Sequence, residues 1–192
     1  NGTLINDAGT FYIITTRQRL GFRDEQEYKS YGYTFDQAVP ASSFDKALPA
    51  GGINKAMEGT LVLDAVDGRT VYMIGTGSTK RGFTSAAVFK ALGYSLENLP
   101  KINLSDYPTG NPISKANLPH PDGSLVSQGK TIWWIRNGQK TGFESMAVFN
   151  TYGFSLSRVV KANSADMALP EGPIVKFRDG TLVLDQRTYN FI

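Results

Sequence analysis

The sequence DGSLVSQGKTIWWIRNGQKTGFESMAVFNTYGF, residues 122–154, decides the fold, because it is the clearest copy of a unit that the chain repeats. Each unit opens with an acid or asparagine followed by glycine. The opening glycines are Gly2, Gly59, Gly123 and Gly180, which spaces successive units by 57, 64 and 57 residues. An aromatic segment, a Gly-Phe pair, a second Gly-aromatic pair and a Pro-x-Gly sequence follow in the same order. Repetition at such a period is typical of an array of similar supersecondary units.

The spacing predicts three complete repeats and a partial fourth, with the ranges 1–57, 58–121, 122–178 and 179–192. Repeats of this length are near the size at which an isolated hydrophobic core is only marginally stable. We therefore expect neighbouring repeats to share buried surface.

Within each repeat, short apolar and aromatic segments are separated by Gly-containing turns, which is typical of hairpins. In the third repeat Asn137-Gly138 lies at a hairpin tip, and the third strand is expected to end at Gly142-Phe143. The period then changes to that of a helix: aromatic or apolar residues follow the N-cap positions Asp24, Ser85 and Ser145 at helical spacing. The predicted fold class is α+β, each repeat being a small antiparallel sheet with one or two short helices.

The predicted short helices end at glycines, and a second helical turn follows. Gly32, Gly93 and Gly153 suit the left-handed position that ends a helix. Further on, a Ser or Asn stands three residues before an acid in every repeat, which indicates a capped helical turn that a proline ends. These pairs are Ser42 with Asp45, Asn103 with Asp106, and Asn163 with Asp166.

The partial fourth repeat is predicted to be a terminal hairpin with an assembly edge. Three interpretations stay open: the natural chain continues, the hairpin completes the sheet of the third repeat, or a neighbouring subunit supplies the missing strand. The residues of this edge are Thr188, Tyr189, Phe191 and Ile192.

Composition excludes several classes of protein. The chain has 192 residues, 41% hydrophobic and 19% charged, as a folded protein does. The net charge of +3 is too small and too evenly spread to predict nucleic-acid binding. There is no cysteine and no apolar run long enough to span a membrane. The chain begins within a repeat motif, so we expect any targeting signal to lie outside it.

No catalytic or metal-binding pattern is evident. The single histidine, His120, stands between two prolines in a linker that is the best hinge candidate, with no orienting partner in view. Asp64 and Asp67-Gly68 resemble a fragment of a calcium loop but lack a third acid, so a turn is the better interpretation. We expect a protein that is not an enzyme and that needs no cofactor and no metal.

Two features are candidates for ligand binding. Because residues of a strand alternate between its faces, one of Trp133 and Trp134 is expected to be buried and the other to point away, where it would suit a sugar ring. The repeated cations of the hairpins would form a row for anionic glycans, although a solvated hairpin face is the commoner explanation. These cations are Arg19, Lys80, Arg81 and Lys140.

The repeat unit resembles a tandem module of bacterial proteins. Its motifs, in order, are Asp-Gly-Thr-Leu-Val, a Val-Tyr-x-Ile strand, a Gly-Phe pair, a Gly-Tyr helix end and a Pro-x-Gly linker. That module occurs in secreted and cell-surface proteins, including wall-associated and surface-layer-like ones. The resemblance covers essentially the whole chain and implies surface attachment, display or assembly outside the cell.

These observations favour a non-catalytic, extracellular structural protein: a subunit of a surface layer, filament or appendage, or a stalk. Its partners would be further copies of itself or neighbouring repeats. The alternative is a module that binds carbohydrate or a cell-wall polymer. Neither interpretation includes nucleic acid or membrane insertion by this segment.

Overall fold

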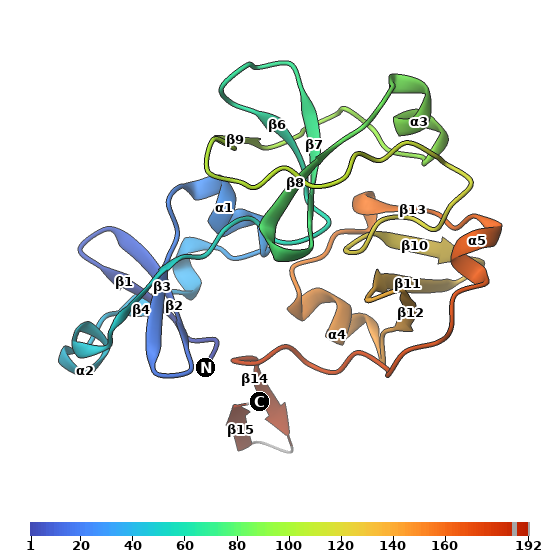
Figure 1. Cartoon of the computed structure of the whole chain (residues 1–192). Coiled ribbons are helices and arrows are strands. Elements are labelled where there is room, and N and C mark those ends of the chain that lie inside the picture. Colours follow the sequence, from blue (N-terminus) through green and yellow to red (C-terminus); the bar gives the residue numbers. More distant parts are fainter. Residues whose placement is uncertain (186–187, 192) are drawn as a thin grey trace. The chain divides into compact units, whose positions relative to one another are not determined.

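The computed structural model describes residues 1–185 and 188–191, with the side chains of residues 1–183. The predicted α+β class is confirmed: three sheets of four or five strands alternate with short helices (Figure 1). The chain forms two compact units, and several segments contribute to each. The first unit comprises Asn1–Ala56, Ala147–Phe154 and Lys176–Ile192, and the second comprises Met57–Met146 and Ser155–Val175.

The sheet of the first repeat has the order β4-β1-β2-β3-β5. Its middle three strands form the expected antiparallel hairpins, whereas β4 is parallel to β1 and β5 is parallel to β3. The elements are β1 (Leu4–Asp7), β2 (Thr10–Thr15), β3 (Gln18–Gly21), α1 (Glu25–Ser30), η1 (Phe35–Gln37), β4 (Val39–Pro40), α2 (Ser43–Ala47) and β5 (Ala50–Ile53).

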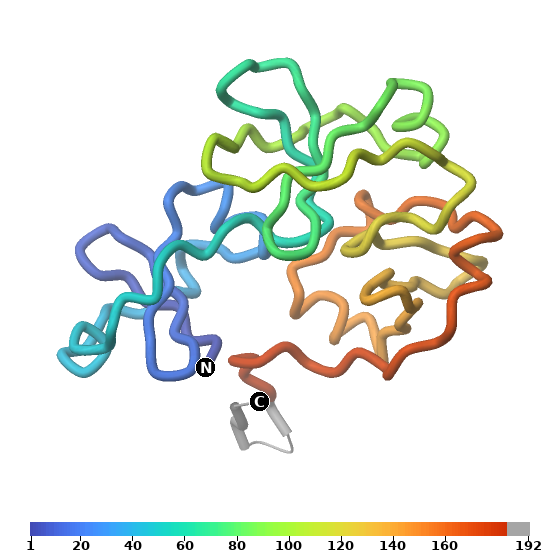
Figure 2. The backbone as a smooth tube through the Cα atoms, in the orientation of Figure 1, coloured from blue at the N-terminus to red at the C-terminus, as the bar shows by residue number. Residues whose placement is uncertain are grey.

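The second repeat has the same arrangement, with the order β8-β7-β6-β9. Its linker joins β8 as a fifth segment through bridges from Lys80 to Thr109 and from Phe83 to Ile113. Figure 2 shows this linker as the yellow-green tube that returns past the strands of its own repeat. The elements are β6 (Leu61–Asp64), β7 (Val71–Gly75), η2 (Thr76–Ser78), β8 (Thr79–Gly82), α3 (Ala86–Ala91) and β9 (Lys101–Ile102).

The sheet of the third repeat has the order β12-β11-β10-β13, and bridges from Lys140 to Glu171 and from Phe143 to Val175 add its linker. The elements are β10 (Leu125–Gln128), β11 (Thr131–Arg136), β12 (Gln139–Gly142), α4 (Met146–Thr151), η3 (Leu156–Arg158), β13 (Val159–Lys161) and α5 (Ser164–Met167).

The expectation of a purely antiparallel sheet is therefore incomplete. The segments after the helix and after the Pro-x-Gly sequence look like caps and linkers in the sequence. In the structure they lie parallel to the first and third strands of each repeat.

The local signals for helices are largely confirmed. Asp24 accepts a hydrogen bond from Glu27 N–H, and Ser85 accepts one from Val88 N–H, as N-caps do. The helix-ending glycines have φ angles between 68° and 78°. The helix residues Tyr28, Phe89 and Phe149 are buried, as the predicted apolar face requires.

The second helical turn forms in the first and third repeats but not in the second. Ser42 and Asn163 begin α2 and α5, each with an acid three residues later. In the second repeat Asn103 Oδ1 accepts a hydrogen bond from Ser105 N–H within an isolated turn. The prediction is wrong there because Pro108 follows Asp106 by two residues instead of four, which leaves no room for the turn.

Each compact unit has its own core. In the first unit Leu4, Ile13, Phe22 and Tyr28 form a buried cluster. In the second unit Met73, Leu92 and Ile113 form another.

The terminal hairpin, β14 (Leu182–Asp185) and β15 (Thr188–Phe191), is a two-stranded sheet of its own. The interpretation that it completes the sheet of the third repeat is therefore wrong. Thr188, Tyr189 and Phe191 lie in β15, but their side chains are outside the described residues, and Ile192 is outside them entirely.

The longest helices in the described part of the chain have six residues, and none has the length and apolar character needed to cross a membrane.

Candidate functional site

The glycine of each Gly-Phe pair lies beneath an aromatic ring of the neighbouring strand. Cross-strand pairs join Tyr12 to Gly21, Tyr72 to Gly82, and Trp133 to Gly142. A Cβ atom built on any of these glycines would lie 3.4–3.5 Å from that ring. The ring thus covers backbone that the missing side chain would otherwise expose.

The repeated cation of each hairpin packs on the same ring. Lys80 Nζ lies 5.6 Å from the centre of the Tyr72 ring, and Lys140 Nζ lies 5.7 Å from the Trp133 ring. In the first repeat the Arg19 guanidinium lies 4.9 Å from the Tyr12 ring. These distances are those of cation–π contacts.

The charged ends of these cations are held inside the repeat. Lys140 is buried, and its Nζ donates to the carbonyls of Met167 (2.8 Å) and Leu169 (2.7 Å) at the end of α5. Lys80 Nζ donates to Leu104 O at 2.9 Å in the equivalent place. The expectation of a solvated hairpin face is therefore wrong for Lys140.

Two arginines of the predicted cationic row also have partners in their own repeat. Arg19 Nη1 lies 3.2 Å from Asp7 Oδ2, and Arg81 Nε donates to Asn111 O at 2.8 Å. The structure thus places these cations on the third strand of each repeat, β3, β8 or β12, beside the segment that the linker adds. Glycan binding by this row stays a prediction.

The tryptophan pair divides as the alternation of a strand requires. Trp134 is buried, stacks on Phe143 with ring centres 6.3 Å apart, and has the Arg136 guanidinium 4.4 Å from its ring. Trp133 is half-buried and lies under Lys140. Trp133 is therefore a packing residue of the hairpin, and sugar binding by it stays a prediction.

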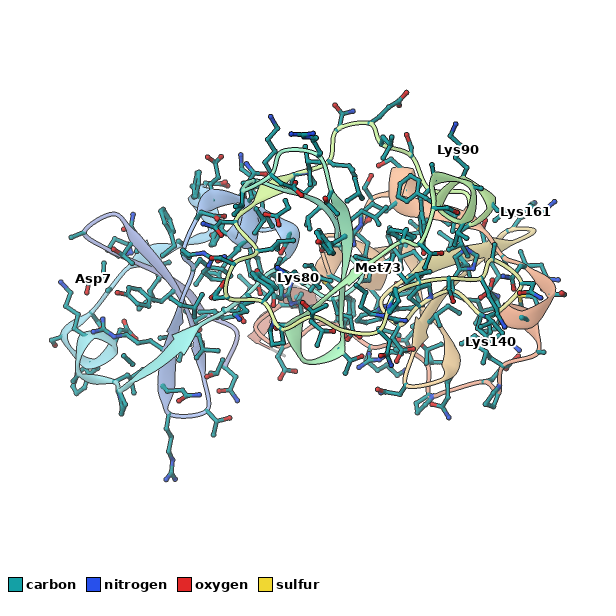
Figure 3. All side chains as sticks on the ribbon, turned by 45° about the horizontal axis from the view of Figure 1, so that its top comes forward. Asp7, Met73, Lys80, Lys90, Lys140 and Lys161 are labelled. Carbon is teal, nitrogen blue, oxygen red and sulfur yellow. The ribbon has the colours of Figure 1, made fainter. Side chains whose placement is uncertain are left out.

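We expect Lys140→Met to lower the free energy of unfolding by about 2–4 kcal/mol, because two carbonyls lose the charged donor of a buried side chain while its apolar stem is kept. Urea denaturation followed by tryptophan fluorescence measures this loss. Lys161→Met is the matched control, since Lys161 is exposed on β13 and extends away from the ribbon (Figure 3). Its loss should be within about 0.5 kcal/mol, and equal losses would contradict the role given to Lys140.

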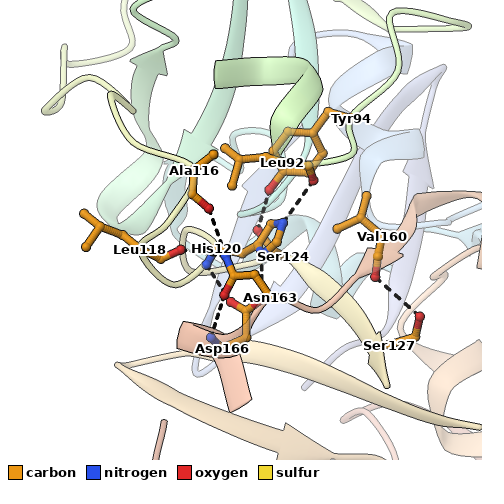
Figure 4. A network of polar contacts seen from close by, with 10 residues as sticks. All are labelled: Leu92, Tyr94, Ala116, Leu118, His120, Ser124, Ser127, Val160, Asn163 and Asp166. Atoms are coloured by element: carbon orange, nitrogen blue, oxygen red, sulfur yellow. Dashed lines mark hydrogen bonds and ion pairs between the residues drawn. The ribbon is translucent and has the colours of Figure 1, made fainter. Parts of the chain in front are cut away.

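His120 is the centre of a polar network that joins the second and third repeats within the second compact unit (Figure 4). Its side chain is buried, with Nδ1 2.7 Å from Asp166 Oδ2 and Nε2 3.0 Å from the carbonyl of Leu92. Its backbone N–H donates to Asp166 Oδ1 at 2.6 Å. The expectation that His120 has no orienting partner is wrong, and the predicted hinge is anchored at this residue.

Both ring nitrogens of His120 face groups that accept hydrogen bonds, a carboxylate and a backbone carbonyl. Burial raises the pKa of Asp166, but hydrogen bonds from His120 and Asn163 outweigh it and hold the pKa below the ordinary value of 3.8. Asp166 is therefore a charged acceptor that receives hydrogen bonds from both sides of the joint between the second and third repeats.

The same joint contains three further contacts from the third repeat. Asn163 Nδ2 donates to the linker carbonyls of Ala116 and Leu118 at 3.1 and 2.8 Å. The hydroxyls of Tyr94 and Ser124 lie 2.9 Å apart, and burial raises the pKa of Tyr94 well above its usual range. The side chains of His120, Asp166, Asn163, Tyr94 and Ser124 thus all have hydrogen-bond partners within this joint.

The acid-glycine turns that open the repeats pack against one another by their backbones. In the second unit, a Cβ atom on Gly59 would lie 2.1 Å from Gly123 O. In the first unit, a Cβ atom on Gly2 would lie 2.4 Å from Asp179 O, beside Gly180. The second repeat thus pairs with the third, and the first pairs with the start of the fourth.

The joint in the first unit has an arginine in place of the histidine network. Arg178 donates to Tyr31 O at 3.1 Å and lies 4.4 Å from the centre of the Tyr33 ring. Burial raises the pKa of Tyr31 to about 12 and also raises that of Tyr33, while Arg178 lowers both. Sequence reasoning missed this joint. The aromatic residues after the helix-ending glycines were its one visible signal.

The acids that resembled a calcium loop serve the turn itself. Asp67 accepts hydrogen bonds from the N–H groups of Arg69 and Thr70 and from the Thr70 hydroxyl, which lowers the pKa of Asp67 to about 2. Asp64 accepts from Val66 N–H. Among the described residues no three His, Cys, Asp or Glu side chains gather as metal ligands would.

Comparisons with known proteins give little likeness. No family model matches the sequence, and no curated protein matches it. A chain in the periplasmic assembly from the ESX-5 inner membrane complex has 14% identity and a TM-score of 0.26, over 100% of this chain and 71% of that one. A chain in the intact ESX-5 inner membrane complex has 14% identity and a TM-score of 0.25, over 99% of this chain and 61% of its own. These TM-scores are too low to equate the folds.

Proposed function

We propose that the chain is a non-catalytic structural protein of the bacterial cell surface, built from tandem repeats and acting through assembly with further copies of itself. This class includes subunits of surface layers, filaments and appendages, and stalks. The extracellular location rests on the resemblance of the repeat to the tandem module of secreted and wall-associated proteins.

One observation carries the proposal. The motifs that recur in the repeats stabilise the fold or the contacts between repeats. The acid-glycine turns contact each other at Gly59 and Gly123, and the Lys140 side chain donates a hydrogen bond to the last carbonyl of α5. The single histidine, the residue most often used for acid–base catalysis, is buried between two repeats. A chain whose recurring residues serve packing and joints is what a structural array requires.

The test is the mass and appearance of the purified chain. Light scattering over a series of concentrations, with negative-stain electron microscopy of the same samples, should show ordered assemblies heavier than the 21.0 kDa monomer. A mass that stays at 21.0 kDa up to the solubility limit contradicts the proposal. In that case a screen against wall polysaccharides with Trp133→Ala tests the carbohydrate-binding alternative.

A further inference from the structure

The terminal hairpin β14–β15 has the same local structure as the start of a complete repeat. Thr181 N–H donates to Arg178 O at 3.1 Å, as Ser124 N–H donates to Pro121 O at 3.1 Å in the third repeat. The two strands also pair in the register that the complete repeats share. In the four repeats the cross-strand partners are Leu4 with Ile13, Leu61 with Met73, Leu125 with Trp134, and Leu182 with Phe191. The hairpin is therefore the first half of a repeat in its usual register.

The leucine of this hairpin is exposed, although its equivalents in the first and third repeats are buried. Leu4 and Leu125 keep 7% and 3% of their surface accessible, whereas Leu182 keeps 51%. Leu182 follows an acid-glycine turn and lies in a first strand, as the other two leucines do. The difference therefore comes from what packs on the leucine.

The complete repeats show which segment covers this leucine. In the first repeat, Leu4 forms a buried cluster with Phe22 of the Gly-Phe pair and with Tyr28 of α1. In the second repeat the equivalent leucine and the phenylalanine of the Gly-Phe pair, Leu61 and Phe83, pack on the cluster that contains Leu92 at the end of α3. The cover is thus the end of the third strand together with the helix that follows it.

The backbone of the hairpin is open to the same segment. In each complete repeat the second strand pairs with a third, β2 with β3, β7 with β8, and β11 with β12. In the described residues β15 pairs with β14 alone. A hairpin of two strands is marginally stable by itself, and its free edge offers N–H and C=O groups to a further strand. The open edge and the exposed leucine therefore fit one and the same ligand.

We propose that the hairpin β14–β15 binds a segment made of the third strand and the helix of a repeat of this kind. Such a segment is an extended strand that ends in Gly-Phe, followed by a two-turn helix with an aromatic residue on its buried side. Residues 139–154 of the third repeat are an example. The bound segment would pair with β15 and cover Leu182, which is strand addition with a matching side-chain contact.

The donor of this segment is a separate polypeptide. The three segments of this kind in the described residues are already paired in the sheets of their own repeats. A second folded copy would have its own three segments occupied in the same way. The inference therefore goes beyond the proposed function, because its partner is a different chain that carries an unpaired half of such a repeat.

The test measures binding of a labelled peptide, with the sequence of residues 139–154, to the full chain by fluorescence anisotropy. We expect saturable binding that Leu182→Ser weakens by about tenfold or more, because the peptide loses its apolar contact. Leu96→Ser is the matched control, since Leu96 is a leucine of the second repeat that is 62% exposed. It should leave the dissociation constant unchanged.

A changed peptide and a second measurement locate the contact. The peptide with Phe143→Ser should bind about tenfold more weakly, because the equivalent Phe22 packs with the leucine of its own repeat. Hydrogen exchange should show that the bound peptide protects the amides of residues 188–191. Circular dichroism of Leu182→Ser should match that of the native chain, since the substituted side chain is exposed.

Three outcomes would overturn the inference. An unrelated strand-forming peptide of the same length might bind equally well, which would show that the edge accepts any strand. Binding that Leu182→Ser leaves unchanged would place the peptide elsewhere. Self-association of the full chain that Leu182→Ser abolishes would make a second copy the partner.

The proposed function is judged separately, by the mass of the native chain alone. If the peptide does not bind but the native chain forms assemblies, this inference is wrong and the proposed function stands. If the peptide binds as expected but the mass stays at 21.0 kDa, the inference stands and assembly with further copies is wrong.

Discussion

Asp166→Ala is expected to lower the free energy of unfolding of the second compact unit by about 3–5 kcal/mol, because several buried groups lose the carboxylate that accepts their hydrogen bonds. The buried imidazole of His120 loses its carboxylate, and the backbone N–H groups of His120 and Asn163 lose their acceptor. Urea denaturation followed by the fluorescence of Trp133 and Trp134 measures the loss.

Asp45→Ala is the matched control. Asp45 occupies the same position in α2 of the first repeat, where it accepts hydrogen bonds from Ser42 and is only half-buried. Its loss should be much smaller than that of Asp166. Equal losses from the two variants would mean that Asp166 acts only as a helix cap and that the joint adds nothing.

The same pair predicts sensitivity to acid. The pKa of Asp166 is lowered in the folded chain, so its contribution is fully present above the ordinary value of 3.8. It is lost as the pH falls through the lower pKa of the folded state. The urea midpoint, measured from about pH 6 to about pH 2, should therefore fall more steeply in the native chain than in Asp166→Asn.

Gly123→Ala should have the second large effect, about 2–5 kcal/mol. The residue has a φ of 90°, where any side chain is strained, and its Cβ atom would lie 2.3 Å from Gly59 N. The clash is with backbone, so the two repeats must separate to relieve it. Thermal denaturation by calorimetry measures the loss and shows whether one transition becomes two.

Gly138→Ala isolates the contact from the backbone strain. Gly138 has a φ of 67°, but a Cβ atom there would meet nothing within 4 Å, so its loss should be about 1–2 kcal/mol. The double variant Gly59→Ala with Gly123→Ala should cost less than the sum of the single variants, because turns already separated no longer clash. Additive losses would show that the turns do not meet.

The sequence predicts the fold of one repeat well, because the signals are local. The caps Asp24 and Ser85, the hairpin turn at Asn137-Gly138 and the strand end at Gly142 are all where the pattern places them. Each depends on residues a few positions apart, and the same local signals recur in the copies of the motif.

The joints could not be predicted in the same way. His120 and Asp166 lie 46 residues apart, and the carboxylate already had a sufficient explanation as a helix cap. The partners of Lys140 are backbone carbonyls, which have no signature in a sequence. The local capping pattern also failed in the second repeat, because the segment between its acid and its proline is too short. Pro108 comes two residues too early for a helical turn to form.

The pairing of Gly59 with Gly123 has a consequence for how such chains diverge after duplication. The contact is made by main-chain atoms, so it does not depend on the identity of the neighbouring side chains. Duplicated copies can therefore change their surfaces, as Phe44 and Ser105 have at one position, without losing the ability to dock. For this contact selection needs to preserve only the two glycines, so exposed positions elsewhere in a repeat can acquire new partners while the turns keep docking.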